Sequence, residues 1–209
     1  MPSVRDELEK ALGFRRNTLR ISNYPVATNW KHTYWWREGN VEFAEAQFVA
    51  QIAKEYPVLS LGAAVEKGFE IPQVPKQKSM DRRTWDWPRF VDNVEQVLLR
   101  DVAEVATKLG ESVHLRIKNK AWRDEKGKPW TTRAFSFVDG KWFERYVGGI
   151  DPRVIVDHIR DLNNQKDFWA IVHFARDLGP NEADGLSAQQ MAQALIAFDP
   201  IRRRLKGAL

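Results

Sequence analysis

Basic and aromatic side chains recur at alternate positions within residues 114–145, and no other pattern in the chain points as directly to a chemical role. Alternate residues of an extended strand share one face, so this spacing gathers positive charge on one side of a sheet. Cations there would contact phosphates and release counterions, while aromatic rings could stack on bases. The sequence therefore predicts a face that binds a polyanion, nucleic acid first. Its candidate contacts are Arg116, Lys118, Lys120, Trp122, Trp130, Lys141, Phe143 and Arg145.

The net charge of the chain, +5, is concentrated in this region. Residues 114–133 hold seven lysines and arginines and two acidic residues, so the rest of the chain is neutral overall. Cations on adjacent strands repel one another, and a bound polyanion would relieve that repulsion. The alternative is an ordinary solvated sheet face, on which lysines also protect strand edges from aggregation. The sequence leaves both interpretations open.

Catalysis has weaker candidates, namely Glu66, Glu111 and His173. A metal-dependent nuclease needs acidic residues that converge near a lysine, and the two Asp-x-Lys pairs in the chain fall on predicted turns. His173 lies in an apolar run, where burial could make it a general base, although such a histidine is more often neutral and hydrogen-bonded. A nuclease, or another enzyme acting on phosphate esters, is therefore the second hypothesis.

No cofactor or metal site is predicted. The sequence contains no cysteine, which excludes disulfides, thiolate zinc sites and iron–sulfur clusters. None of the four histidines has the spacing of a metal-binding pair. We therefore expect a protein that works through side chains alone.

Tryptophan is abundant, with nine in the chain. Trp30, Trp35 and Trp36 gather with His32 and Tyr34, and such rings could dock a protein partner. An adaptor that binds another protein is therefore the third hypothesis. The alternative is that these rings close the core beneath the helices, because tryptophan is usually well buried.

Helices are predicted from apolar residues spaced three or four apart and from capping signals at both ends. Asn40 and Pro57 bound one such segment, and Gly110 ends the longest one. The predicted helices cover residues 3–13, 41–56, 86–109, 151–162 and 187–198, followed by a basic last turn with Arg202, Arg203, Arg204 and Lys206.

Strands are predicted from alternating or continuous apolar residues. The turn Asp139-Gly140 is the strongest hairpin signal, because both central residues of a type I′ turn need positive φ. The run FWAIVHF suggests a central strand buried on both faces, and Gly62 suggests a bulge. The predicted strands cover residues 58–70, 112–122, 129–138, 141–147 and 168–174.

The hairpin fixes a register and therefore sorts side chains by face. We expect Val138 opposite Lys141, Ser136 opposite Phe143, Ala134 opposite Arg145, and Lys118 beside Ala134 on the other side. The basic face is expected to carry no acidic residue and to be open to solvent. The core face is expected to hold Val113, Leu115, Ile117, Phe135, Phe137 and Trp142.

Length and composition indicate the class of protein. The 209 residues are 43% hydrophobic and 29% charged, which fits one folded domain with its own core. No apolar run is long enough to span a bilayer and no signal peptide is evident, so we expect a cytoplasmic protein without membrane contacts. The predicted fold is α+β, an antiparallel meander with additional strands packed against several helices on one face. Residues 1–209 are expected to form a single domain, with the basic, Pro-containing segment 71–84 as the one candidate boundary.

Overall fold

The computed structural model describes residues 4–15, 19–22, 34–38, 47–52, 59–68, 87–119, 131–161 and 169–206. These ranges contain every element discussed below. The predicted boundary at 71–84 lies outside them.

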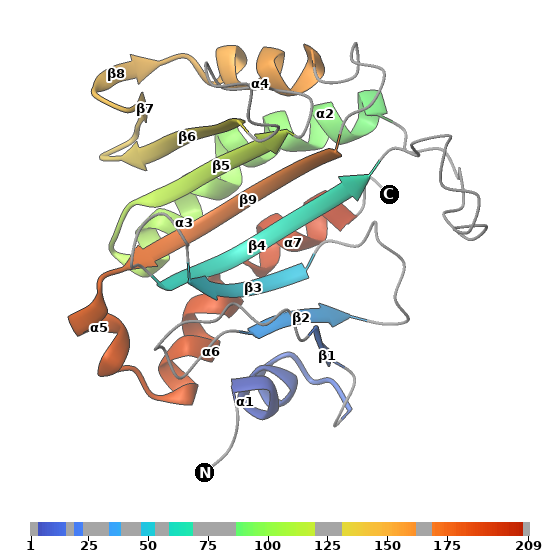
Figure 1. Ribbon diagram of the computed structural model, residues 1–209, viewed down its shortest axis with the longest axis vertical. Coiled ribbons are helices and arrows are strands. Elements are labelled where there is room, and N and C mark those ends of the chain that lie inside the picture. Colours follow the sequence, from blue (N-terminus) through green and yellow to red (C-terminus); the bar gives the residue numbers. More distant parts are fainter. Residues whose placement is uncertain are drawn as a thin grey trace.

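The described strands form one antiparallel sheet in the order β1-β2-β3-β4-β9-β5-β6-β7-β8. The first four strands and β5 to β8 are two meanders, and β9 joins them by pairing with β4 on one side and β5 on the other (Figure 1). The prediction that the last strand is central is therefore confirmed. The strands are β1 Leu19–Ser22, β2 Tyr34–Glu38, β3 Gln47–Ile52, β4 Leu59–Gly68, β5 Val113–Asn119, β6 Thr131–Val138, β7 Lys141–Glu144, β8 Val147–Ile150 and β9 Trp169–Leu178.

Helices cover one face of this sheet. Figure 1 shows α2, α3, α6 and α7 behind the strands, while none of the described helices lies over the face turned toward the viewer. That second face is called the open face below. The predicted α+β class, with helices on one face, is thus confirmed. The helical segments are α1 Val4–Ala11, α2 Trp87–Gln96, the π-helical turn η1 Val97–Asp101, α3 Val102–Leu109, α4 Pro152–Asp161, α5 Pro180–Asp184, α6 Ala188–Ala197 and α7 Asp199–Lys206.

The core lies between the sheet and these helices. The apolar residues of the long predicted helix do face the sheet, and Gly110 ends it with a left-handed φ of 66°. The six side chains expected on the core face of the meander are all buried, as predicted. The shared core includes Val94, Leu98, Val102, Leu115, Phe135, Phe137, Trp142, Val172 and Phe174.

Gly62 is the point of closest approach between β4 and β9. A Cβ atom there would lie 1.9 Å from the carbonyl oxygen of Phe174, so no larger residue fits without separating the strands. The pairing runs on regularly through Gly62 and Ala175. The predicted bulge is therefore wrong, and the glycine serves close packing of two backbones instead.

The predicted helix at 41–56 is also wrong, because Gln47–Ile52 forms β3 between β2 and β4. Phe48 and Ile52 are four residues apart, and this spacing repeats on one face of a strand as well as on one face of a helix. The neighbouring strands decide between the two by supplying backbone hydrogen bonds along both edges.

The register of the meander is correct at one turn and shifted at the other. Asp139 and Gly140 have φ of 48° and 77°, and the pairs Val138–Lys141 and Ser136–Phe143 form as predicted. On the other side Lys118 pairs with Thr132, two residues from the expected Ala134. A shift by two preserves the face of every side chain, so the sorting survives.

Candidate functional site

The centre of the open face is polar. Strand pairing places Arg116 of β5 opposite His173 of β9 on one side and Ala134 of β6 on the other. In the next row, His114 lies between Ala175 and Ser136. His173 and Ala175 are buried although they belong to this face, so β9 is enclosed on both sides at its middle.

Arg116 is held in a closed network across three strands. Its Nη2 donates to the carboxylate of Asp177 in β9, and its Nη1 donates to the Ser60 hydroxyl of β4 at 3.2 Å. Ser60 in turn donates to the other oxygen of Asp177 at 2.6 Å. The prediction that this face carries no acidic residue is therefore wrong, because Asp177 neutralises Arg116.

The network keeps Asp177 ionised. Burial by itself would raise the pKa of this carboxyl, but the charge and hydrogen bond of Arg116 outweigh burial. The Ser60 hydroxyl and His114 add to the same effect, so the pKa of Asp177 lies below its usual value. A carboxylate and a guanidinium with this little solvent form a fixed ion pair, and Arg116 has little charge left to offer a ligand.

His114 forms a second polar contact beside this network. Its Nδ1 lies 2.9 Å from the Ser136 hydroxyl across β5 and β6. Burial lowers the pKa of His114, with Asp177 opposing that shift and Arg116 adding to it. The ring is therefore neutral at pH 7. A serine beside a neutral histidine could act as a nucleophile and base only with a third group to orient the ring, and Asp177 makes its described hydrogen bonds to Arg116 and Ser60 instead.

Of the catalytic candidates, Glu66 and His173 have their backbones on the adjacent strands β4 and β9, with His173 opposite Ala64, whereas Glu111 does not join them. Glu111 forms an ion pair with Arg176, whose side chain lies on the opposite face of β9 from His173 because the two residues are three apart. Glu66 lies in β4, and its backbone pairs with Ile171. In the described ranges no group of three or more histidine, aspartate or glutamate side chains is placed to hold a metal ion.

The outer part of the open face, over β7 and β8, is different. Lys141 is exposed, and Phe143 packs its ring over Gly148, where a Cβ atom would lie 2.4 Å from the ring. Glu144 points to Arg133, at 3.2 Å, rather than to Lys141. The two-residue turn Arg145–Tyr146 then leads into β8.

This turn corrects one prediction and adds a residue. Arg145 has φ of 55° and lies in the turn, so it does not pair with Ala134 as expected. Tyr146 is 101% exposed, the most exposed large apolar side chain described. Sequence reasoning missed both β8 and Tyr146, because KWFERYV was interpreted as one strand. The signal was the pair Gly148-Gly149, since small residues let a return strand pass beneath the Phe143 ring.

The remaining predicted contacts are only partly described. Lys118 is placed by its backbone in β5, and Trp35 and Trp36 by theirs in β2. Lys120, Trp122 and Trp130 lie outside the described residues, as do Trp30 and His32. The basic C-terminal residues form α7, where Arg202 and Arg203 pair with Asp199 and Arg204 pairs with Asp101 of η1. These arginines tie α7 to itself and to the long helix.

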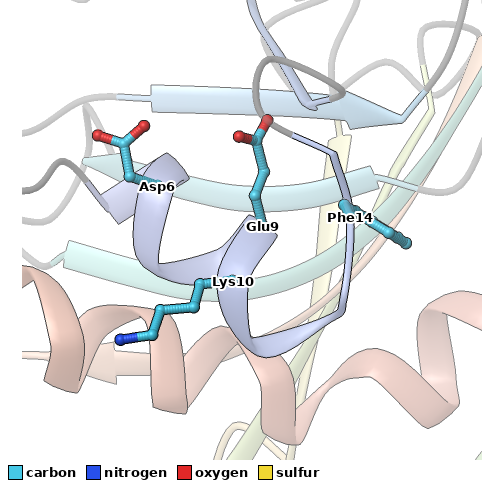
Figure 2. Close-up of a pocket in the computed structure, with 4 residues that line it drawn as sticks. All are labelled: Asp6, Glu9, Lys10 and Phe14. Atoms are coloured by element: carbon cyan, nitrogen blue, oxygen red, sulfur yellow. The ribbon is translucent and has the colours of Figure 1, made fainter.

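A pocket of about 380 Å³ lies beside α1 at the other end of the molecule. Asp6, Glu9, Lys10 and Phe14 line it, and Figure 2 shows both carboxylates on the side of α1 away from Lys10. Asp6 and Glu9 already interact with other groups, and Glu9 is almost fully buried. The acidic lining therefore serves local structure.

Comparison with known proteins adds no assignment: the chain matches no family model, and no curated protein and no solved structure matches it significantly. None of the described helices has the length and apolar character needed to cross a bilayer.

Proposed function

We propose that the protein binds a polyanion, nucleic acid first, through the outer half of the open face. The outer half is defined as the exposed surface of β6, β7 and β8, with Ala134, Lys141, Phe143, Arg145 and Tyr146. The observation that supports this proposal is that Lys141 is exposed on a face over which none of the described helices lies, and that Arg145 is exposed in the turn directly after β7. The acid between them in sequence, Glu144, is taken up by Arg133.

The spacing of these cations suits an extended anion. Lys141 begins β7 and Arg145 follows its last residue, so at about 3.3 Å per residue the strand between them is roughly 10 Å long. The small side chain of Ala134 leaves a shallow surface over the neighbouring strand β6. A phosphate backbone could therefore follow β7 and contact both charges.

The central half of the face does not support the same proposal. Arg116 contributes little accessible charge, because it donates to Asp177 and Ser60 and its side chain is only 16% exposed. Lys118 follows Arg116 by two residues in β5 and stays a candidate contact by that position. The proposal rests on the outer half alone.

The first test is salt dependence of binding by the unmodified chain. Heparin and a labelled single-stranded oligonucleotide would be titrated at several salt concentrations. Two phosphate contacts predict a slope of log affinity against log salt of about −1.5 or steeper, because each contact releases roughly 0.7 to 0.9 counterion. If the unmodified chain binds neither heparin nor the oligonucleotide at low salt, the proposed function is wrong.

The second test localises the site by charge reversal. Lys141→Glu with Arg145→Glu should weaken heparin binding at least tenfold, or about 1.4 kcal/mol. The matched control is Arg100→Glu with Arg160→Glu, which changes net charge equally at exposed positions of the helical layer. Equal loss in both double variants would show that only overall charge matters and would remove the outer half from the proposal.

A further inference from the structure

The turn between β7 and β8 is built to present a side chain. Tyr146 is fully exposed at its tip, and the next residue, Val147, is 67% exposed. A large apolar side chain that stays exposed does not stabilise the fold, because folding removes little of its surface from water. An aromatic ring left in water beside a cation is typical of a contact residue.

The backbone of this turn is itself unusual. Arg145 has φ of 55°, a left-handed conformation that favours glycine and that other residues adopt only when the surroundings require it. Strain of this kind gathers at binding sites, where it fixes the direction of a side chain. Here the left-handed residue is a cation, so the strained position and the charge are the same residue.

The hairpin that carries the turn is anchored from both faces. On the core side Trp142 is 2% exposed and packs edge-on against Phe137 with ring centres 5.3 Å apart. On the open side the Phe143 ring closes over Gly148. A turn fixed in this way can offer Tyr146 with little loss of conformational freedom on binding.

The cations and rings of this hairpin indicate which class of partner it would bind. Lys141, Phe143, Arg145 and Tyr146 alternate cation and ring along one hairpin, and neither cation has an ion-pair partner among the described residues. A protein strand is a poor fit for the edge, because Gly149 has φ of 75° and interrupts the pairing of β8. Phosphates and bases match the alternation, since every base offers a face for stacking.

We propose that Tyr146 stacks on a base of a single-stranded nucleic acid whose phosphates contact Arg145 and Lys141. This inference rests on the proposed function and narrows it to single strands, because a base held in a duplex presents no face to the turn. The contact is tolerant of sequence, since stacking reads no hydrogen-bonding edge.

The test compares Tyr146→Ala and Tyr146→Phe on three ligands: a thymidine oligonucleotide, an abasic oligonucleotide of the same length, and heparin. Tyr146→Ala should weaken binding of the thymidine oligonucleotide at least fivefold, while Tyr146→Phe stays within twofold. Binding of the abasic oligonucleotide and of heparin should change less than twofold in both variants. Leu99→Ala is the matched control, because Leu99 is also an exposed apolar side chain and lies in η1, outside the outer half.

The outcomes separate the two proposals. If the unmodified chain binds heparin and oligonucleotides but Tyr146→Ala leaves all three affinities unchanged, the stacking role is wrong and polyanion binding stands. If Tyr146→Ala weakens the binding of all three ligands equally, Tyr146 stabilises the turn and does not contact a base, which also overturns the inference. If the unmodified chain binds none of the ligands and instead binds an acidic peptide with loss in Tyr146→Ala, the turn serves a protein partner and both proposals fail.

Discussion

The two halves of the open face carry similar side chains and differ in what surrounds them. In the central half Arg116 is enclosed by Asp177 and Ser60, which come from two other strands. In the outer half Lys141 and Arg145 stand exposed, and the adjacent carboxylate, Glu144, is paired with Arg133. The number of cations along a strand therefore does not set the charge of a face. That charge depends on the side chains that distant segments place beside the cations.

The largest expected effect comes from breaking the central network. The side chains of Arg116 and Asp177 are only 16% and 15% exposed. Asp177→Ala should reduce the free energy of unfolding by about 3–5 kcal/mol, because it leaves the charge of Arg116 mostly buried and without its partner. Urea denaturation at pH 7 measures the loss. The double variant Arg116→Met with Asp177→Leu should recover much of it, since no charge is then left buried. A double variant no more stable than Asp177→Ala would show that the pair is not the source of the effect.

A smaller loss of stability is expected on acidification. Burial lowers the pKa of His114, and burial followed by the charge of Arg133 lowers that of His158, both from 6.5. The folded state therefore binds protons less readily than the unfolded chain. The contribution of these two histidines to stability is fully present above pH 6.5 and is lost as the pH drops through each lowered pKa. Thermal unfolding between pH 7.5 and 5 measures this slope. His114→Gln should flatten it, and an unchanged slope would assign the effect elsewhere.

Asp177 extends the same dependence to lower pH. Because its pKa lies below 3.8, its contribution is present above that value and is lost as the pH falls further. The central half, which contains both Asp177 and His114, is thus expected to be sensitive to acid.

The strained turn gives a smaller effect of opposite sign. Arg145→Gly should raise the free energy of unfolding by roughly 0.5–1 kcal/mol, because glycine relieves the left-handed conformation at a modest entropic cost. The same variant should weaken heparin binding, since a contact charge is lost. Thermal melts and heparin titrations of one preparation test both parts. A fall in stability together with intact binding would mean that Arg145 supports the turn and not a ligand.

The smallest effect is expected for Trp142→Phe, at the anchor of the outer half. The indole Nε1–H of Trp142 is buried without a hydrogen-bond acceptor among the described residues. Trp142→Phe removes that unsatisfied donor along with part of the ring packing, so the two effects should offset to within about 0.5 kcal/mol. The control Trp142→Ala removes the same donor together with the whole ring, so the cavity it leaves should cost about 3–5 kcal/mol. A loss in Trp142→Phe of more than about 1.5 kcal/mol would show that the donor is hydrogen-bonded in solution.

Local patterns were sufficient to predict much of this fold. The long helix ending at Gly110, the Asp139-Gly140 turn and the buried run of β9 each depend on residues close in sequence. The segment at 47–52 could not be assigned in this way, because its apolar spacing fits a helix and a strand equally. The β7–β8 turn was missed for a related reason: Arg145 is not a residue that turn chemistry suggests for a left-handed position.

The site was harder to predict than the fold. Faces were sorted correctly because strand alternation is strict, which placed Arg116, Lys141 and Phe143 on one face. Asp177 lies 61 residues from Arg116 in sequence, and no local pattern reveals that β9 brings it alongside. The charge that a face presents depends on such tertiary pairing and therefore escapes a count of lysines and arginines.

Hydrogen exchange with and without heparin would test most directly whether the outer half is the binding surface. We expect slower exchange for amides of residues 141–150 and little change for residues 59–63, 113–117 and 172–178. Protection centred on β4, β9 and β5, with none in β7 and β8, would contradict this expectation.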